Sequence, residues 1–221
     1  MTEPGTRILS TDPNIYHKIK IAQIKRQTIP IIVMIIGILI NVFWSFVGFQ
    51  ILTIACFGWY LWERIIFRTK RKIARPEPDT CVAPFDGKVI SVLTGEDTTI
   101  VTLKKSILDV VELRLPLPNP VQESPQVWHF DTKSGPVDLR ISAPSLKVYE
   151  HRNIHADVIG IIPGNATAML HLPATVHFKL EPKNLIFGGE TVLFDLNEAP
   201  VTVQERISIL VEEPLGEEPD A

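Results

Sequence analysis

The hydrophobic residues of the chain follow one pattern up to about residue 66 and a different pattern after residue 80. Residues 27–62 form a run of 36 positions without a single charge, whereas one membrane-spanning helix needs ~20 apolar residues. Polar and small residues interrupt this run around Asn41 to Gln50. The pattern therefore predicts two helices, at about residues 28–45 and 48–66, and the alternative is one long tilted helix.

The residues after position 80 form short segments rich in Val, Ile, Leu and Thr, several of which alternate apolar with polar side chains. Turn-forming residues separate them, and this spacing is typical of an all-β sandwich or barrel. The expected strands lie at residues 88–93, 99–105, 109–115, 126–130, 137–142, 146–151, 157–162, 168–172, 176–180, 191–196 and 201–213. The sequence thus predicts an α+β membrane protein, with an N-terminal two-helix transmembrane hairpin followed by an all-β domain of the barrel-sandwich type.

These patterns divide the chain into five segments. We expect a basic cytoplasmic segment at residues 1–27, a transmembrane helical hairpin at 28–66, a basic and proline-bearing linker at 67–80, a β-rich domain at 81–211 and an acidic tail at 212–221.

The net charge of −3 conceals two parts of opposite sign. Residues 1–75 carry 11 Lys and Arg against 3 Asp and Glu, a net of +8, and residues 76–221 carry 11 against 22, a net of −11. Basic residues beside membrane spans meet anionic lipid headgroups, so membrane phospholipids are expected partners. Nucleic acid is not an expected partner, because the β-rich part is acidic and has no basic stripe.

Basic residues flank the apolar run on both sides, and the positive-inside rule places such flanks in the cytoplasm. We therefore expect a protein of the cell (inner) membrane whose two termini and β domain are cytoplasmic. The residues expected at the membrane surface are Lys18, Lys20, Lys25, Arg26, Arg64, Arg68, Lys70, Arg71 and Lys72.

Metal and disulfide chemistry have little support in the sequence. The cysteines, Cys56 and Cys81, form no CxxC pair. The histidines do not combine with carboxylates at metal-ligand spacing; they are His17, His129, His151, His155, His171 and His177. No metal site is predicted.

Two segments, CVAPFDGKVISV (81–92) and GGETVLFDL (188–196), are similar to the two halves of a barrel-sandwich fold. The segments YEHRN (149–153) and IGIIPGNATAMLHLP (159–173) are similar to the Glu-Arg-Asn stretch and to the Gly-Ser segment of phosphatidylserine decarboxylases, in the same order. Together with the basic N-terminus and the hairpin, they make the chain resemble the small, membrane-hairpin type of phosphatidylserine decarboxylase. The resemblance covers nearly the whole chain.

That resemblance implies a chemistry that the chain cannot complete. In the family, a serine attacks the preceding glycine carbonyl, a pyruvoyl group results, and an Asp and a His assist. Asp86 matches the Asp, although Asp-Gly also forms turns. Val111 stands where the His belongs, and Asn165-Ala166 replace the Gly-Ser pair. A pyruvoyl cofactor is therefore not expected, because alanine has no hydroxyl group.

The favoured function is a catalytically inactive, membrane-anchored relative of the decarboxylase. It would act as an accessory, assembly or lipid-binding subunit of a membrane complex, with membrane proteins as further partners. One alternative is an active phosphatidylserine decarboxylase with an atypical processing site, for which Thr167 supplies a nearby hydroxyl group. The other is a barrel-sandwich adaptor protein.

Overall fold

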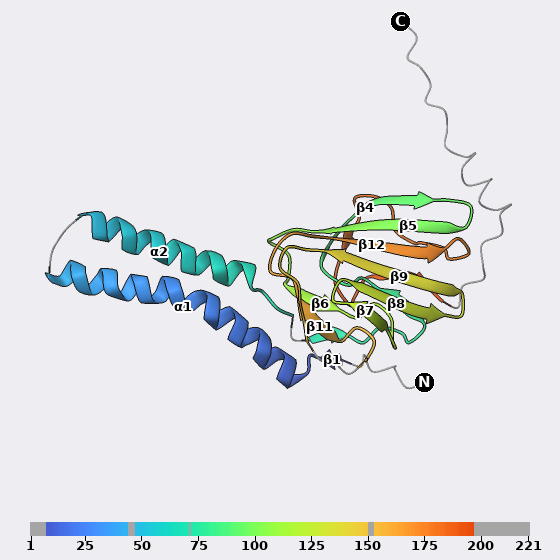
Figure 1. The fold of residues 1–221 in the computed structure, drawn as a ribbon, viewed down its shortest axis with the longest axis horizontal. Helices are drawn as coiled ribbons and strands as arrows, with labels where there is room; N and C mark the ends of the chain where they lie inside the picture. Colours follow the sequence, from blue (N-terminus) through green and yellow to red (C-terminus); the bar gives the residue numbers. More distant parts are fainter. Residues whose placement is uncertain (1–7, 44–46, 71, 150–152, 197–221) are drawn as a thin grey trace, which may run out of the picture.

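The computed structural model describes residues 8–43, 47–70, 72–149 and 153–196, and it consists of a helical hairpin that projects from a β domain (Figure 1). Arg71, the acidic tail at 212–221 and the strand predicted at 201–213 lie outside the described residues.

Helices α1 (Pro13–Phe43) and α2 (Val47–Ile66) lie side by side and form the hairpin. Because the two helices pack against each other, one long helix is excluded. The first helix begins at Pro13 and not at about residue 28, which corrects the sequence prediction. Asp12 explains the early start, because its carboxylate accepts a hydrogen bond of 2.8 Å from the backbone N–H of Asn14 and Pro13 occupies the first helical position. The basic segment is therefore part of the apolar helix.

Figure 1 shows α1 bending along its length, and Pro30 lies inside the helix, where proline removes a backbone hydrogen bond. Beyond the bend α1 and α2 project away from the β domain. They approach closely at Gly37, where a Cβ atom would lie 2.7 Å from Oγ1 of Thr53. Their outward faces are apolar and largely exposed.

The strands are short and, apart from β1, follow the hairpin. In chain order they are β1 (Ile8–Ser10), β2 (Lys72–Ala74), β3 (Thr80–Val82), β4 (Gly87–Thr94), β5 (Thr98–Lys105), β6 (Glu112–Arg114), β7 (Val121–Ser124), β8 (Val127–Thr132), β9 (Gly135–Ser142), β10 (Lys147–Val148), β11 (Val158–Ile161), β12 (Ala166–Pro173), β13 (Leu185–Ile186) and β14 (Val192–Asp195).

All strand pairs are antiparallel. The main sheet has seven strands in the order β13-β4-β5-β12-β9-β8-β7, a second sheet has the order β10-β11-β6, and two-stranded sheets join β14 to β3 and β1 to β2. Strands β5, β9 and β12 alternate buried with exposed positions, as a sheet with one covered face requires. The α+β class is therefore confirmed.

The expected barrel does not form. The main sheet is open, with β13 and β7 as its two edges, and no closed barrel exists among the described strands. Strand β7 has no buried residue, so nothing holds this edge against another sheet. The strand predicted at residues 176–180 is also absent: Val176 is buried in the core, but the segment joins no sheet ladder.

The pair of β1 and β2 was not expected. It joins the residues before the hairpin to those after it, with Leu9 opposite Ile73. Residues 67–80, predicted as a linker only, therefore contain a strand. The pairing fixes both ends of the hairpin at one place beside the β domain.

The main core lies between the inner face of the seven-stranded sheet and the smaller sheets. It contains Leu103, Trp128 and Leu170 from the large sheet, together with Leu113 and Phe194 from the small ones. A second apolar cluster, called here the joint, connects the hairpin to the β domain. The joint consists of Ile15, Ile19, Ile66, Phe67, Val111, Val158 and Ile161, all buried.

Candidate functional site

The strand ends that carry or adjoin the residues selected by the resemblance lie at the end of the β domain nearest the hairpin (Figure 1). Strand β4 begins there, β5 ends there and β12 begins there. The loop after β5 runs beside the end of the hairpin, where the N–H of Val111 donates to the carbonyl oxygen of Arg68 at 3.1 Å. The candidate site is therefore built from segments far apart in the sequence.

Lys105 is the buried cation of this site. It lies directly opposite Ala166 on the neighbouring strand, on the inner face of the sheet, and is fully buried. Its ammonium group donates to the carbonyl oxygens of Ser106 at 3.0 Å, Asp109 at 3.2 Å and Gly164 at 3.3 Å. Burial lowers the pKa of Lys105 to about 8, against the attraction of nearby carboxylates. Lys105 thus lies opposite Ala166, the position that the resemblance equates with the reactive serine.

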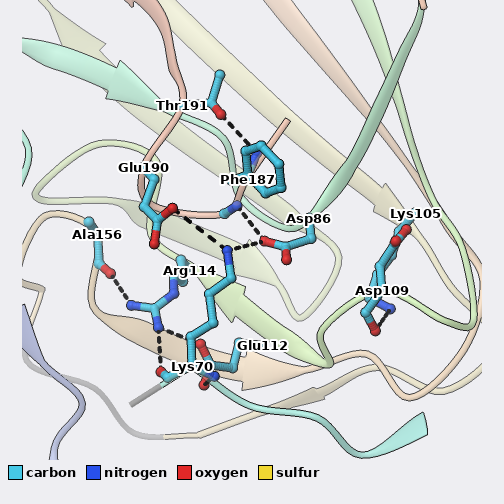
Figure 2. Close-up of polar contacts among 11 residues, drawn as sticks. Lys70, Asp86, Lys105, Asp109, Glu112, Arg114, Ala156, Phe187, Glu190 and Thr191 are labelled. Atoms are coloured by element: carbon cyan, nitrogen blue, oxygen red, sulfur yellow. Dashed lines mark hydrogen bonds and ion pairs between the residues drawn. The ribbon is translucent and has the colours of Figure 1, made fainter. Parts of the chain in front are cut away.

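Asp86 fixes the chain that arrives from the hairpin. Its Oδ1 atom lies 3.1 Å from the ammonium nitrogen of Lys70 and accepts a hydrogen bond of 2.7 Å from the N–H of Gly188, as Figure 2 shows. The ammonium of Lys70 also lies 3.8 Å from Glu190 and 5.0 Å from the ring centre of Phe187. Asp86 therefore contacts both the end of the hairpin and the loop at Gly188, in addition to preceding Gly87 in the Asp-Gly pair.

A buried ion pair lies behind Lys70 (Figure 2). Glu112 and Arg114 contact each other and are 3% and 2% exposed. Arg114 also donates to the carbonyl oxygens of Ala156 at 3.1 Å and of Lys70 at 3.0 Å, and Glu112 accepts from the N–H of Lys70 at 2.8 Å. Burial raises the pKa of Glu112, and Arg114 opposes that shift. These contacts satisfy most of the pair's hydrogen-bonding capacity, which a buried ion pair requires.

Val111 is fully buried in the joint. Ile15 and Ile19 of α1 and Phe67 after α2 belong to the same cluster. At this position, where the resemblance would place a histidine, the valine side chain packs against the hairpin. Its side chain lies among apolar neighbours.

Asn165 and Ala166 have different surroundings. Asn165 is exposed, and its side-chain oxygen accepts a hydrogen bond of 2.8 Å from the N–H of Ile107. Ala166 faces the core and is 5% exposed. Thr167 is in register with Lys104 and Ser142 on the outer face of the sheet, so its hydroxyl lies on the side opposite Lys105.

The site brings a buried ammonium and the carboxylate of Asp109 together at the 164–166 backbone, but residue 166 has no nucleophile and residue 111 has no base. Among the described residues, no group of three or more His, Cys, Asp or Glu side chains is placed to hold a metal ion. His129 is paired instead with Asp138 at 2.7 Å and Glu123 at 3.1 Å on the outer face.

Several basic residues expected at a membrane surface contact other parts of the protein. Arg26 lies 3.9 Å from Glu63 and 5.4 Å from the ring centre of Phe67. The remaining contacts are Lys18 with the ring of Tyr149, Lys20 with the ring of Tyr16, Arg64 with the hydroxyl of Tyr60, Arg68 with the carbonyl oxygen of Leu108, and Lys70 with Asp86. Lys25 and Lys72 are exposed.

Sequence reasoning did not identify Lys105 or Arg114, and it assigned Lys70 to the membrane surface and not to this site. A signal for Lys105 was present, because in a strand that alternates, one member of the Lys104-Lys105 pair must face inward. The same holds for Glu112 and Arg114, which are two residues apart and therefore share one face. No local signal marks Lys70, whose partners are 16 and more residues away.

Comparison of the chain with protein-family models, with curated proteins and with solved structures gives no match. The relationship to phosphatidylserine decarboxylases therefore stays a hypothesis that rests on the motifs described above.

Proposed function

We propose that the protein is a membrane-anchored, non-catalytic relative of phosphatidylserine decarboxylase, whose β domain serves as an accessory or assembly subunit of a membrane complex. The observation that carries this proposal is the burial of Val111 in the joint. A position that serves proton transfer in the family holds the hairpin against the β domain in this chain.

The surface of the hairpin supports a membrane anchor. Ile29, Ile32 and Ile36 on α1 and Ile51 and Ile54 on α2 are between 49% and 71% exposed. Among the described helices, α1 has the length and hydropathy needed to cross a membrane. Soluble monomers rarely expose a continuous apolar surface of this kind.

The pairing of β1 with β2 supports a hairpin topology in the membrane. Residues 8–10 and 72–74 are hydrogen-bonded neighbours, so both ends of the hairpin lie on the same side of any bilayer that it enters. The basic flanks favour the cytoplasmic side of the cell membrane. The β domain would then stand at the cytoplasmic surface.

Intact mass spectrometry tests the missing chemistry. We expect a single species of 24.8 kDa from the purified chain and no carbon dioxide from phosphatidylserine. The double variant Asn165→Gly/Ala166→Ser restores the pair found in the family and should also stay uncleaved at pH 7, because Val111 provides no base and Lys105, with a pKa of about 8, is mostly protonated. Cleavage of the unmodified chain near residues 165–167, or release of carbon dioxide, would refute the proposal.

The accessory role has its own test. Gentle-detergent purification of the tagged full-length chain from its membrane should recover stable protein partners. A variant with Val111→Asp disrupts the joint and should lose these partners while the hairpin stays in the membrane fraction. Recovery of the wild-type chain alone, without a partner, would argue against an accessory subunit.

One observation favours the active alternative. The lowered pKa of Lys105, to about 8, and its contact with the carbonyl oxygen of Gly164 place a potential base beside the 164–166 backbone. Thr167 cannot use it, because its side chain is on the other face of the sheet. The same mass measurement decides between the two functions.

A further inference from the structure

Two lysines lie directly opposite each other at the end of the main sheet nearest the hairpin. Lys88 on β4 is in register with Lys104 on β5, and both side chains are exposed. Like charges at opposed positions destabilise a sheet. Within the part of the chain that the structure describes, neither ammonium group makes an ion pair or a hydrogen bond. The pair is therefore an unbalanced concentration of positive charge.

The lysines line a pocket of about 450 Å³ together with Gly87, Ser106, Asp109, Asn165 and Leu185. The polar groups of this pocket have a defined orientation. The side-chain oxygen of Asn165 accepts from the N–H of Ile107, which leaves its NH₂ group as a donor. One oxygen of Asp109 accepts a hydrogen bond of 2.6 Å from the N–H of Ser106. The hydroxyl of Ser106 supplies another donor.

The charges of the pocket select an anion. Lys88 and Lys104 face it directly, and the buried ammonium of Lys105 lies beneath the same strand end. The negative charge of the Asp109 carboxylate opposes them. However, Lys105 interacts electrostatically with this carboxylate and also donates a hydrogen bond to the backbone carbonyl oxygen of Asp109. Several donors around two cations suit a phosphate group, which has several acceptor oxygens.

An apolar edge adjoins the cationic part. Leu185 on β13 is directly opposite Lys88 and is 69% exposed, and the nearby Phe187 is 49% exposed. A ligand that combines a phosphate with an apolar group could cover both. Strand β4 begins and strand β5 ends at the side of the β domain that faces the hairpin (Figure 1), and the pocket is lined by residues of these strand ends.

We propose that Lys88, Lys104, Ser106 and Asn165 form a binding site for the phosphate group of a phosphoester. The phosphate belongs either to a lipid headgroup or to a soluble phosphoester. The lipid source rests on the proposed membrane location, whereas the binding of a phosphate does not.

The test uses the full-length chain purified in an uncharged detergent. Binding is measured for glycerol 3-phosphate and for dihexanoyl phosphatidylglycerol, with dihexanoylglycerol as the probe that lacks phosphate. We expect one or both phosphate probes to bind and to raise the melting temperature. The variant Lys88→Gln/Lys104→Gln should weaken binding at least about 10-fold, because it removes two charge-assisted contacts.

The matched control is Lys133→Gln/Arg140→Gln, which removes two positive charges from exposed positions outside the pocket. It should bind the probes like the wild type. Because Lys88 and Lys104 repel each other, their replacement should leave the melting temperature without ligand equal or higher, which shows that the variant is folded. Asn165→Ala provides a second, smaller perturbation that leaves both charges in place.

Each outcome decides a part of the proposal. Binding of glycerol 3-phosphate alone identifies a soluble phosphoester, and binding of the short-chain lipid alone identifies a headgroup. Equal affinity of the wild type and Lys88→Gln/Lys104→Gln overturns the site, and so does an equal loss in the matched control. Membrane partition of the hairpin is measured separately by flotation with phosphatidylcholine vesicles, so its failure is distinct from failure of the site.

Discussion

Lys104 and Lys105 are neighbours in sequence and lie on opposite faces of the same strand. Lys105 points inward, is fully buried and donates to three carbonyl oxygens. Lys104 points outward, faces Lys88 across the sheet and has no partner among the described residues. The comparison shows that the face of the sheet, rather than the residue type, decides whether a cation stabilises the fold or stays available to a ligand.

Replacement of the inner lysine should have the largest effect. We expect Lys105→Met to lower the free energy of unfolding by about 3 kcal/mol, because three carbonyl oxygens lose their donor at the end of the core. Lys104→Met should change it by less than about 0.5 kcal/mol, as surface substitutions do. Thermal unfolding in detergent measures both. Equal losses in the two variants would remove the distinction between the faces.

A substitution in the joint should cause the next largest loss in the free energy of unfolding. Val111→His introduces the residue type of the family into an apolar cluster, and we expect a loss of about 2 kcal/mol from burial of an unpaired polar ring. The variant should remain uncleaved. A matched Val110→His substitution affects a less buried neighbour and should cost less. A fully stable Val111→His chain would show that the joint tolerates polar groups.

The pH dependence of stability provides a further test of the inner lysine, Lys105. The pKa of Lys105 is about 8 in the folded chain and 10.5 in its ordinary state, so between these values the unfolded chain binds more protons. Stability from this group should therefore rise with pH, by roughly 1 kcal/mol between pH 8 and pH 9. The difference between the wild type and Lys105→Met isolates it. A difference that stays constant with pH would contradict the lowered pKa.

The outer face also carries a titrating group, with the smallest expected effect. Hydrogen bonds to Asp138 and then Glu123 raise the pKa of His129 above its ordinary value of 6.5. The folded state therefore gains stability below pH 6.5 and loses it as the pH rises through the folded pKa. Nuclear magnetic resonance of the imidazole should show the raised pKa, and Asp138→Asn should lower it. An unchanged titration in that variant would assign the shift to another cause.

The sequence was sufficient to predict the hairpin and most strands of the main sheet. The uncharged run has the composition of two packed apolar helices, and alternation in residues 99–105 and 168–172 reports one buried face directly. The helix start was missed because the basic residues before Gln27 were interpreted as a separate surface segment. The Asp12-Pro13 pair was the available signal for it.

The remaining features depend on contacts between distant segments, which a single sequence does not encode locally. Strands β1 and β2 have three residues each, and each forms by pairing with the other across more than 60 positions of sequence. Strand β7 is an exposed edge of the main sheet, and its sequence does not reveal this. Within the site, the resemblance directed attention to Asp86, Val111, Asn165 and Ala166, but the contacts of Lys70 with Asp86 and Glu190 could not be predicted from the sequence.

The joint has a mechanical consequence. Two isoleucines of α1, the end of α2 and strand β11 share one apolar cluster, and the β1–β2 pair closes the same region. The β domain is thus attached to the hairpin by packed side chains and a strand pair as well as by the connecting chain. In a bilayer, the depth and tilt of the hairpin would set the height and orientation of the cationic pocket, so a change in bilayer thickness would be transmitted to the pocket as a rigid displacement.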